Sequence, residues 1–262
     1  MSPLDRMAVW WERGSGRVGE YWRRSAGFRR AIARQWARTR RWPLSWLTVY
    51  AVVVATLGYG VLDRPLAFWF KAHVTGEFEG FLKTVTHLGL AGLWLVPSGL
   101  LWVVLMLAWR AAPLVEIRAR LGRVAWVPAF IFLSVAVSGL INTAIKIGIG
   151  RLRPRALFED NVYGFLPLTH GYISNSFPSG HSQAAFAAMT AMMLVFPRYD
   201  ALFLTVAVLV AASRVLTTVH FLSDAVMGAW LGVVVTVLLY RLLAWRGIDV
   251  RLKFERDRKL LG

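Results

Sequence analysis

The sequence of 262 residues contains no cysteine. Disulfide bonds and thiolate chemistry are therefore excluded, and any metal site would have to be assembled from five histidines and fourteen carboxylates. We see no convincing cluster of such ligands along the chain, and expect neither a metal nor another cofactor. The absence of cysteine leaves the redox conditions around the protein undetermined.

Charged residues are also scarce, at 17% of the chain, and the 14 acidic residues are outnumbered by 31 Lys and Arg. Hydrophobic residues make up 57%, which is too many for an ordinary soluble domain and enough for several membrane spans. A net charge of +17 could indicate nucleic acid, but the arginines lie mostly outside the apolar runs, where they can meet anionic lipid headgroups. We therefore expect a lipid bilayer and no nucleic acid as partner. The oligomeric state stays unknown.

The first 43 residues lack the short apolar core and small-residue cleavage site of a secretory signal, so we expect none to be removed. This segment mixes arginine with aromatic residues, a composition that suits an amphipathic helix at the headgroup level. A partly disordered basic tail fits that composition equally well. We divide the chain into this N-terminal segment (1–43), a membrane domain (44–246) and a basic tail (247–262).

Six apolar runs follow Pro43, each near the roughly 20 residues that cross a hydrocarbon core. We expect spans at 44–62, 87–109, 125–149, 181–196, 201–218 and 221–245. The fourth run is short for a full span unless the loop before it lies inside the membrane boundary. The connection 63–86 is aromatic-rich and could hold an interfacial helix, whereas 151–180 reads as a loop. The predicted fold class is all-α, a polytopic membrane protein of six helices.

The first of three polar motifs is Lys146-x6-Arg153-Pro154, at the end of the third run. If the helix continues, Lys146 and Arg153 are seven residues apart and nearly in line on one face. Both side chains could then bind one anion, and a lysine after an apolar stretch is by default a functional hypothesis. The alternative is that both side chains only extend to the membrane interface.

The second motif is Ser176-Phe-Pro-Ser179-Gly180-His181, where a loop enters the fourth run. Ser179 and Gly180 at a helix start can direct a hydroxyl and backbone N–H groups at phosphate oxygens, with help from the helix dipole. His181 would stand beside that anion. The alternative is an ordinary helix N-cap.

The third motif is Ser213-Arg214-x5-His220-x3-Asp224. His220 and Asp224 are four residues apart, so they share a helical face, and the carboxylate can hold one ring nitrogen while the other points at a substrate. Arg214 would lie about 240° around a continuous helix from His220, so both reach one site only if the helix breaks at 215–219. The alternative is a purely structural His–Asp pair.

Other polar residues fit none of these motifs. We interpret the small polar residues of the third run as helix packing positions rather than substrate contacts. The residues concerned are Ser134, Ser138, Asn142 and Thr143. We interpret His73, His87 and His170 as solvated interfacial residues.

The three motifs, complete and in this order, resemble the type 2 phosphatidic-acid phosphatase family, which includes lipid phosphate phosphatases and is related to vanadium haloperoxidases. The motifs cover about 139–230. The resemblance implies a metal-independent phosphatase in which His220 forms a phosphohistidine, Asp224 orients it, and His181 protonates the leaving group and later activates water. It further implies that the phosphoryl oxygens are bound by Lys146, Arg153, Ser179, Gly180 and Arg214.

A catalytic set at the ends of spans suits a phosphate presented from the bilayer, so we expect a phosphorylated membrane lipid as substrate. Lipid A, phosphatidylglycerophosphate, undecaprenyl pyrophosphate and phosphatidic acid are the candidates, and 88–100 is reminiscent of lipid A phosphatases. A lipid-to-lipid phosphotransferase using the same intermediate is the alternative, and a non-catalytic scaffold that kept the motifs is disfavoured.

The distribution of basic residues predicts the orientation. With six spans, 23 of the 31 Lys and Arg fall on the side of the two termini and eight on the other. Because positive residues favour the cytoplasmic side, we expect both termini in the cytoplasm of a bacterium and the three motifs at the periplasmic face of its inner membrane.

Overall fold

The structure is a computed structural model that describes residues 35, 38–39, 41–168, 171 and 173–252. The chain forms two compact units, Met1–Val49 and Tyr50–Gly262, and the account below concerns the second. Most of the N-terminal segment, for which we predicted an amphipathic helix or a basic tail, lies outside the described residues, as do His170 and the last ten residues.

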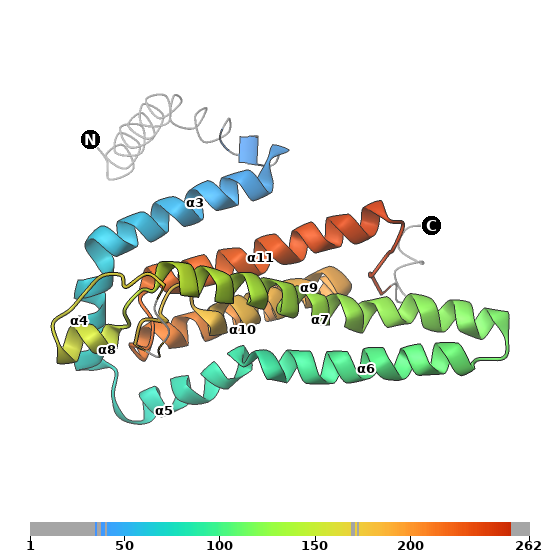
Figure 1. The fold of residues 1–262 in the computed structure, drawn as a ribbon, viewed down its shortest axis with the longest axis horizontal. Coiled ribbons are helices and arrows are strands. Elements are labelled where there is room, and N and C mark those ends of the chain that lie inside the picture. Colours follow the sequence, from blue (N-terminus) through green and yellow to red (C-terminus); the bar gives the residue numbers. More distant parts are fainter. Residues whose placement is uncertain (1–34, 36–37, 40, 169–170, 172, 253–262) are drawn as a thin grey trace, which may run out of the picture. The chain divides into compact units, whose positions relative to one another are not determined.

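The regular structure of the described residues is helical, apart from one isolated bridge between Arg151 and Phe165 (Figure 1). The long helices are α3 (Pro43–Leu57), α4 (Asp63–His73), α5 (Gly76–Val85), α6 (Ala91–Ala111), α7 (Val115–Ile149), α9 (Gly180–Val195), α10 (Asp200–Leu216) and α11 (Leu222–Trp245). Shorter helical turns are η1 (Gly58–Leu62), η2 (Thr86–Gly89), α8 (Pro154–Glu159) and η3 (Pro197–Tyr199). The predicted all-α fold class is confirmed.

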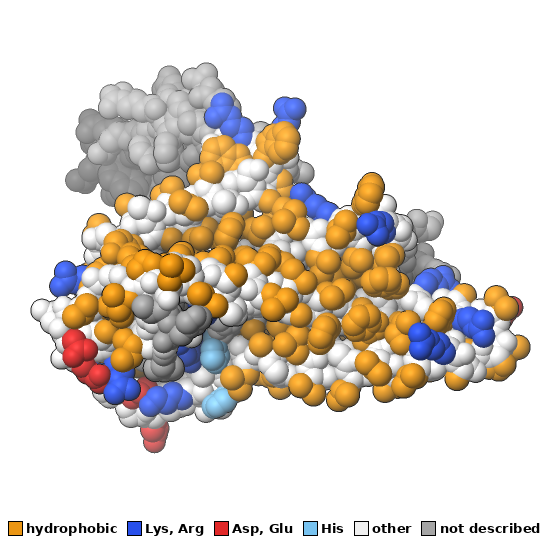
Figure 2. Space-filling view, in the orientation of Figure 1, with side chains coloured by type: hydrophobic (Ala, Val, Ile, Leu, Met, Phe, Trp, Pro, Cys, Tyr) orange, Lys and Arg blue, Asp and Glu red, His pale blue; other side chains and the backbone are white. Residues whose placement is uncertain are grey.

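Within the described residues, five helical segments are long and apolar enough to cross a membrane, so the chain is a multi-pass membrane protein. They are Pro43–His73, Gly76–Ala111, Val115–Ile149, Pro197–Leu216 and Leu222–Trp245. Each matches one of the predicted runs, although Pro197–Leu216 ends two residues before its run does and Leu222–Trp245 begins one residue after its run does. Figure 2 shows hydrophobic side chains over the middle of this face, with Lys and Arg gathered towards the ends of the α6–α7 pair. The fourth run forms α9, which has only 16 residues. That α9 also crosses the membrane, which would bring the number of spans to six, stays a prediction.

Helix α9 lies inside the bundle, packed against α7, α10 and α11. Its inward positions are small, with Ala184, Ala187, Ala188 and Ala191 fully buried. Close approach of α11 requires a glycine, because a Cβ on Gly232 would come within 2.6 Å of the Gln183 carbonyl oxygen. Small residues of this kind let membrane helices approach closely. The start of α9 is thereby held against the ends of its three neighbours.

Two helix ends decide where the polar motifs lie. Helix α7 stops at Ile149, and Gly150 adopts the left-handed conformation with φ +59°. The helix therefore ends where the third run was predicted to end, and the condition for Lys146 and Arg153 to lie in line on one helical face is not met. The physical reason is the close approach of Leu166, whose carbonyl oxygen would lie 1.8 Å from a Cβ at position 150.

The predicted break between Arg214 and His220 is confirmed. Helix α10 ends at Leu216 and α11 begins at Leu222, with Thr218 at a positive φ of 52° in the turn. The connection 63–86 contains α4 and α5, so its predicted helical content is confirmed, and the 151–180 loop contains only the short α8.

Candidate active site

Backbone hydrogen bonds join the three motif-bearing segments at one end of the bundle. The loop after α7 pairs with the loop before α9, because Arg153 N–H donates to the Ile173 carbonyl at 2.9 Å and Ser176 N–H to the Arg151 carbonyl at 2.9 Å. The start of α9 meets α11 where Ser179 N–H donates to the Asp224 carbonyl at 3.0 Å. Residues far apart in sequence thus form one cluster.

Two of the predicted phosphate-binding cations, Lys146 and Arg153, approach the same backbone carbonyl oxygen, that of Asn175. Lys146, in the last turn of α7, donates from Nζ to the Asn175 carbonyl at 3.0 Å, and Arg153 Nη2 lies 3.4 Å from the same oxygen. A Cβ on Gly180 would be 3.9 Å from Lys146 Cε, so the start of α9 adjoins the lysine. The two cations gather at one position even though they do not share a helix.

Arg214 closes the site from another side. It lies in the last turn of α10, is 8% exposed, and donates from Nη1 to Thr86 Oγ1 of η2 at 2.9 Å. Its carbonyl accepts from His220 N–H at 3.1 Å, which ties the cation to the predicted nucleophile across the helix break.

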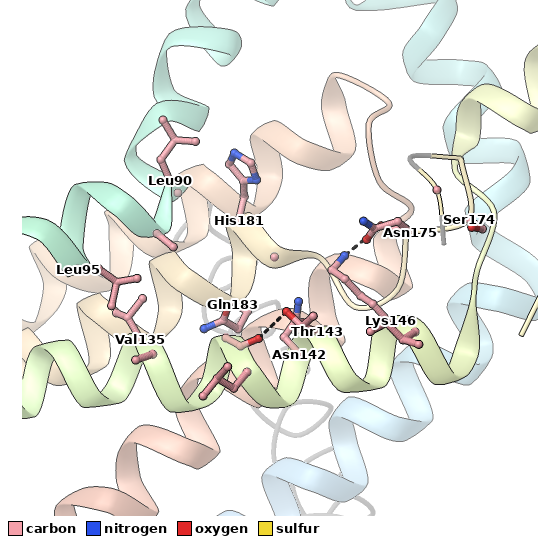
Figure 3. Close-up of a pocket in the computed structure, with 18 residues that line it drawn as sticks. Leu90, Leu95, Val135, Asn142, Thr143, Lys146, Ser174, Asn175, His181 and Gln183 are labelled. Carbon is pink, nitrogen blue, oxygen red and sulfur yellow. Dashed lines mark hydrogen bonds between the residues drawn. The ribbon is translucent and has the colours of Figure 1, made fainter. Parts of the chain in front are cut away.

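A cavity of about 740 Å³ opens beside these groups, between η2, α6, α7 and α9. Figure 3 shows Lys146, Asn175 and His181 at its polar part, and Leu95 and Val135 at its apolar part. The cavity can therefore hold a molecule with a charged end and an apolar end. Among its lining residues are two that we interpreted as packing positions, Asn142 and Thr143.

His220 is 3% exposed and precedes α11, whose N-cap is Phe221. Its Nδ1 lies 3.7 Å from Asp224 Oδ2, longer than a direct hydrogen bond. The Ser176 hydroxyl donates to that Oδ2 at 2.6 Å and lies 3.4 Å from Nδ1. The prediction that His220 and Asp224 share a helical face is therefore wrong, because the helix begins after His220. The two residues are instead held together by the helix cap, in which Phe221 N–H donates to Asp224 Oδ2 at 2.9 Å.

The environment keeps His220 in its neutral form. Burial lowers the pKa of this imidazole to about 3, although Asp224 opposes the shift, and the charges of Arg153 and Lys146 lower the pKa further. A neutral imidazole retains the lone pair that a nucleophile needs. With Nδ1 facing a carboxylate, the proton belongs on Nδ1 and the lone pair on Nε2.

Ser179 caps helix α9, whereas Ser138 of α7 connects α7 to α9. Ser179 is buried at the N-cap of α9, and its side chain accepts from Ser182 N–H at 3.4 Å. Its own N–H donates to the Asp224 carbonyl, and its hydroxyl oxygen also accepts from the Ser182 hydroxyl at 3.0 Å. Ser138 accepts from Gln183 Nε2 at 2.5 Å, which confirms it as a contact between α7 and α9.

Of the remaining histidines, His170 lies outside the described residues, and His87 belongs to η2, the turn that adjoins His181 and Arg214. His73 Nδ1 lies 2.8 Å from the Trp69 carbonyl oxygen and His87 Nδ1 lies 3.2 Å from that of Thr84. In the described part of the chain, no group of three or more His, Asp or Glu side chains is arranged to hold a metal ion.

One buried network was not singled out from the sequence. Arg151, which has no role in the sequence analysis, forms ion pairs with Asp224 Oδ1 at 2.5 Å and Asp63 Oδ2 at 2.7 Å. All three residues are at most 1% exposed. The available signal was Asp63 itself, an acidic residue inside the 31-residue helical segment Pro43–His73.

Comparison with known proteins places this site in a family. The pattern of the PAP2 superfamily matches residues 128–248. This part of the chain belongs to the PAP2 superfamily. The resemblance inferred from the three motifs is confirmed, and every predicted site residue lies in the PAP2 segment.

Curated relatives extend the comparison. The chain is 34% identical over 122 residues to the lipid A 1-phosphatase of Rhizobium johnstonii, covering 45% of this chain and 50% of the relative. It is 36% identical over 109 residues to that of Rhizobium etli, covering 42% and 47%. The chain thus spans about half the length of these relatives.

A solved structure supports the fold. The transmembrane PAP2 type phosphatidylglycerolphosphate phosphatase from Bacillus subtilis superposes with a TM-score of 0.56 at 22% identity, covering 77% of this chain and 96% of that one. The two proteins therefore share a PAP2 membrane fold.

Proposed function

We propose that this protein is an integral membrane lipid phosphatase that works through a phosphohistidine on His220. The observation that carries the proposal is the buried, neutral imidazole of His220 held beside Asp224 and Ser176. Three cations, Lys146, Arg153 and Arg214, accompany it at one end of a bundle of apolar helices.

In the first step, Nε2 of His220 attacks phosphorus and the bond between phosphorus and the lipid oxygen breaks. His181 gives its proton to the leaving oxygen, and Asp224 stabilises the positive charge on the phosphorylated ring. In the second step, His181 takes a proton from water as the water oxygen attacks phosphorus, the P–N bond breaks, and phosphate leaves. Three cations, the Ser179 hydroxyl and the N–H of Gly180 stabilise the charge on the equatorial oxygens.

We expect this reaction to need no metal. Purified protein should keep its full rate in EDTA, because fixed cations already stabilise the phosphoryl charge, whereas vanadate should inhibit by mimicking the pentavalent transition state. Phosphate release measured with and without each reagent checks this. Activity lost in EDTA and restored by magnesium would contradict the metal-free mechanism.

The names of the curated relatives favour lipid A among the four candidate lipids. The apolar part of the cavity supports an acyl-chain-bearing substrate. The deciding experiment measures phosphate release from lipid A, phosphatidylglycerophosphate, undecaprenyl pyrophosphate and phosphatidic acid in detergent, with His220→Ala as blank. Release from none of them by folded protein would refute the function. Adding an acceptor lipid tests the alternative, because a phosphotransferase would then form a new phospholipid at the expense of free phosphate.

We further propose six spans, with α9 as the fourth and the site at the periplasmic face. The chain has no native cysteine, so single cysteines can report sidedness. Val162→Cys, 48% exposed in the loop between α8 and α9, should react with an impermeant maleimide in intact spheroplasts, and Val115→Cys, 80% exposed at the start of α7, should not. Both should react after lysis. The opposite labelling would put the site in the cytoplasm.

A further inference from the structure

The most completely buried charged cluster in the described residues surrounds Arg151, and of its members the mechanism above uses Asp224 but neither Arg151 nor Asp63. One guanidinium lies between two carboxylates, Asp63 and Asp224, and all three groups are at most 1% exposed. The two carboxylates come from the start of α4 and the first turn of α11, 161 positions apart in sequence. Breaking such a pair from one side leaves an uncompensated buried charge.

Every hydrogen bond that Arg151 makes with its two Nη atoms goes to protein. Nη1 donates to Asp224 Oδ1 at 2.5 Å and Ser223 Oγ at 2.6 Å, and Nη2 to Asp63 Oδ2 at 2.7 Å and Tyr163 Oη at 3.0 Å. Burial alone would lower the pKa of the guanidinium, but Asp224 and Asp63 raise it above its ordinary value. Arg151 is therefore a permanent cation whose two Nη atoms are both bonded to protein groups, while its buried Nε has no hydrogen-bond partner among the described residues.

Aromatic rings enclose the guanidinium. Its Cζ lies 4.6 Å from the centroid of Phe221, 5.1 Å from Tyr59, 5.6 Å from Tyr163 and 5.9 Å from Phe165. Burial raises the pKa of Tyr163, so this residue stays a phenol that accepts from Arg151 and donates to the Tyr59 carbonyl at 2.9 Å. Arg151 is thus enclosed by protein groups. Lys146 and Arg153, by contrast, both approach the Asn175 carbonyl oxygen, where we propose that phosphate binds.

The two oxygens of Asp224 have different partners. Oδ1 accepts from Arg151, whereas Oδ2 accepts from Ser176 and from Phe221 N–H and faces His220. Holding Oδ1 fixes the rotation of the carboxylate, so Oδ2 points at the imidazole. Asp63 in turn holds Nη2 of Arg151 and accepts from the N–H and hydroxyl of Ser223 at the start of α11.

We propose that Arg151 is a positioning residue for the nucleophile: it orients Asp224, and through Asp224 it orients His220, while Asp63 fixes Arg151. The inference rests on the proposed phosphatase function and deepens it. With one cation between two carboxylates, the cluster has a net charge of −1 next to the ring. That charge favours the positively charged phosphorylated imidazole over the neutral free one.

The test compares Arg151→Lys with wild type in the purified full chain. A lysine ammonium is a point charge that cannot bridge both carboxylates in the way a guanidinium fork does. Since small misplacements of reacting groups cost about 10²-fold, we expect kcat to fall by roughly that factor with KM changed less than about twofold. Arg155→Lys is the matched control, because Arg155 in the same loop pairs with Glu159 but its side chain is 64% exposed, and it should keep wild-type kinetics.

A double-mutant cycle separates positioning from a structural role. If Arg151 acts through Asp224, then Arg151→Lys should cost less than about threefold when added to Asp224→Asn, because the coupled effect is already lost. Damage to the fold alone would lower kcat by the same factor in both backgrounds. Asp63→Asn is a second variant that keeps Arg151 and Asp224 in place, and we expect about a tenfold lower kcat at unchanged KM.

The outcomes also separate this inference from the proposed function. Wild type that releases phosphate from no lipid contradicts the function. Active wild type with Arg151→Lys and Asp63→Asn at full kcat, with a raised KM instead of a lowered kcat, or with equal losses in both backgrounds overturns the positioning role. If Arg151→Lys does not fold, as judged by size-exclusion chromatography and thermal melting, Asp63→Asn decides alone by the same kcat and KM criteria.

Discussion

Replacing His220 by alanine should abolish lipid dephosphorylation, with kcat reduced by at least about 10⁴-fold. The side chain supplies the nucleophile, and no other described imidazole is held against Asp224 and Ser176. The covalent intermediate should vanish too. Rapid mixing with labelled lipid followed by an alkaline quench measures it, because a phosphohistidine survives alkali and is lost in acid.

His181→Ala gives the informative contrast. We expect a loss of about 10²- to 10⁴-fold with a lipid alkoxide leaving group, and a smaller loss with p-nitrophenyl phosphate, whose leaving group needs no proton. His73→Ala is the control, since among the contacts described His73 touches only Trp69 of its own helix, through the backbone carbonyl and a stacked ring. Equal residual activity in the His220 and His181 variants, or an adduct on another residue, would overturn the assignment.

Most of the helices could be predicted, because a membrane span appears in the sequence as an apolar run of about 20 residues. The position of α9 inside the bundle could not, since lipid and protein interiors are equally apolar and hydropathy does not say which a helix meets. Its alanine and glycine contacts with α11 depend on α9 meeting a particular neighbour. Local periodicity contains no information about that neighbour.

In the site, too, local features could be predicted from the sequence and contacts between distant segments could not. The break after Arg214 was predictable, because two residues needed at one anion cannot both face it from a continuous helix. The end of α7 at Ile149 agrees with the predicted end of the third run, whereas the approach of Leu166 to Gly150 comes from a loop that has no periodic signal. The sequence neighbours of Arg151 indicated no role for it. Its role depends on an ion pair with Asp63, which is 88 residues away in the sequence.

The second large effect is expected from Asp224→Asn, with kcat lower by about 10³- to 10⁴-fold and KM little changed. Arg151 donates to Oδ1, so the asparagine oxygen must take that position and the amide N–H₂ must occupy the place of Oδ2. There it meets two donors, Phe221 N–H and the Ser176 hydroxyl. Facing an N–H donor, His220 Nδ1 becomes an acceptor.

The proton of His220 then moves to Nε2, which removes the lone pair that attacks phosphorus. Asp224→Asn should therefore bind substrate and fail to form the phosphohistidine, which equilibrium lipid binding and the alkaline quench measure separately. Asp200→Asn is the matched control, because Asp200 is an exposed carboxylate in the first turn of α10 and should keep the wild-type rate. A folded Asp224→Asn variant within tenfold of the wild-type kcat would show that orientation of His220 by this carboxylate is not what drives the reaction.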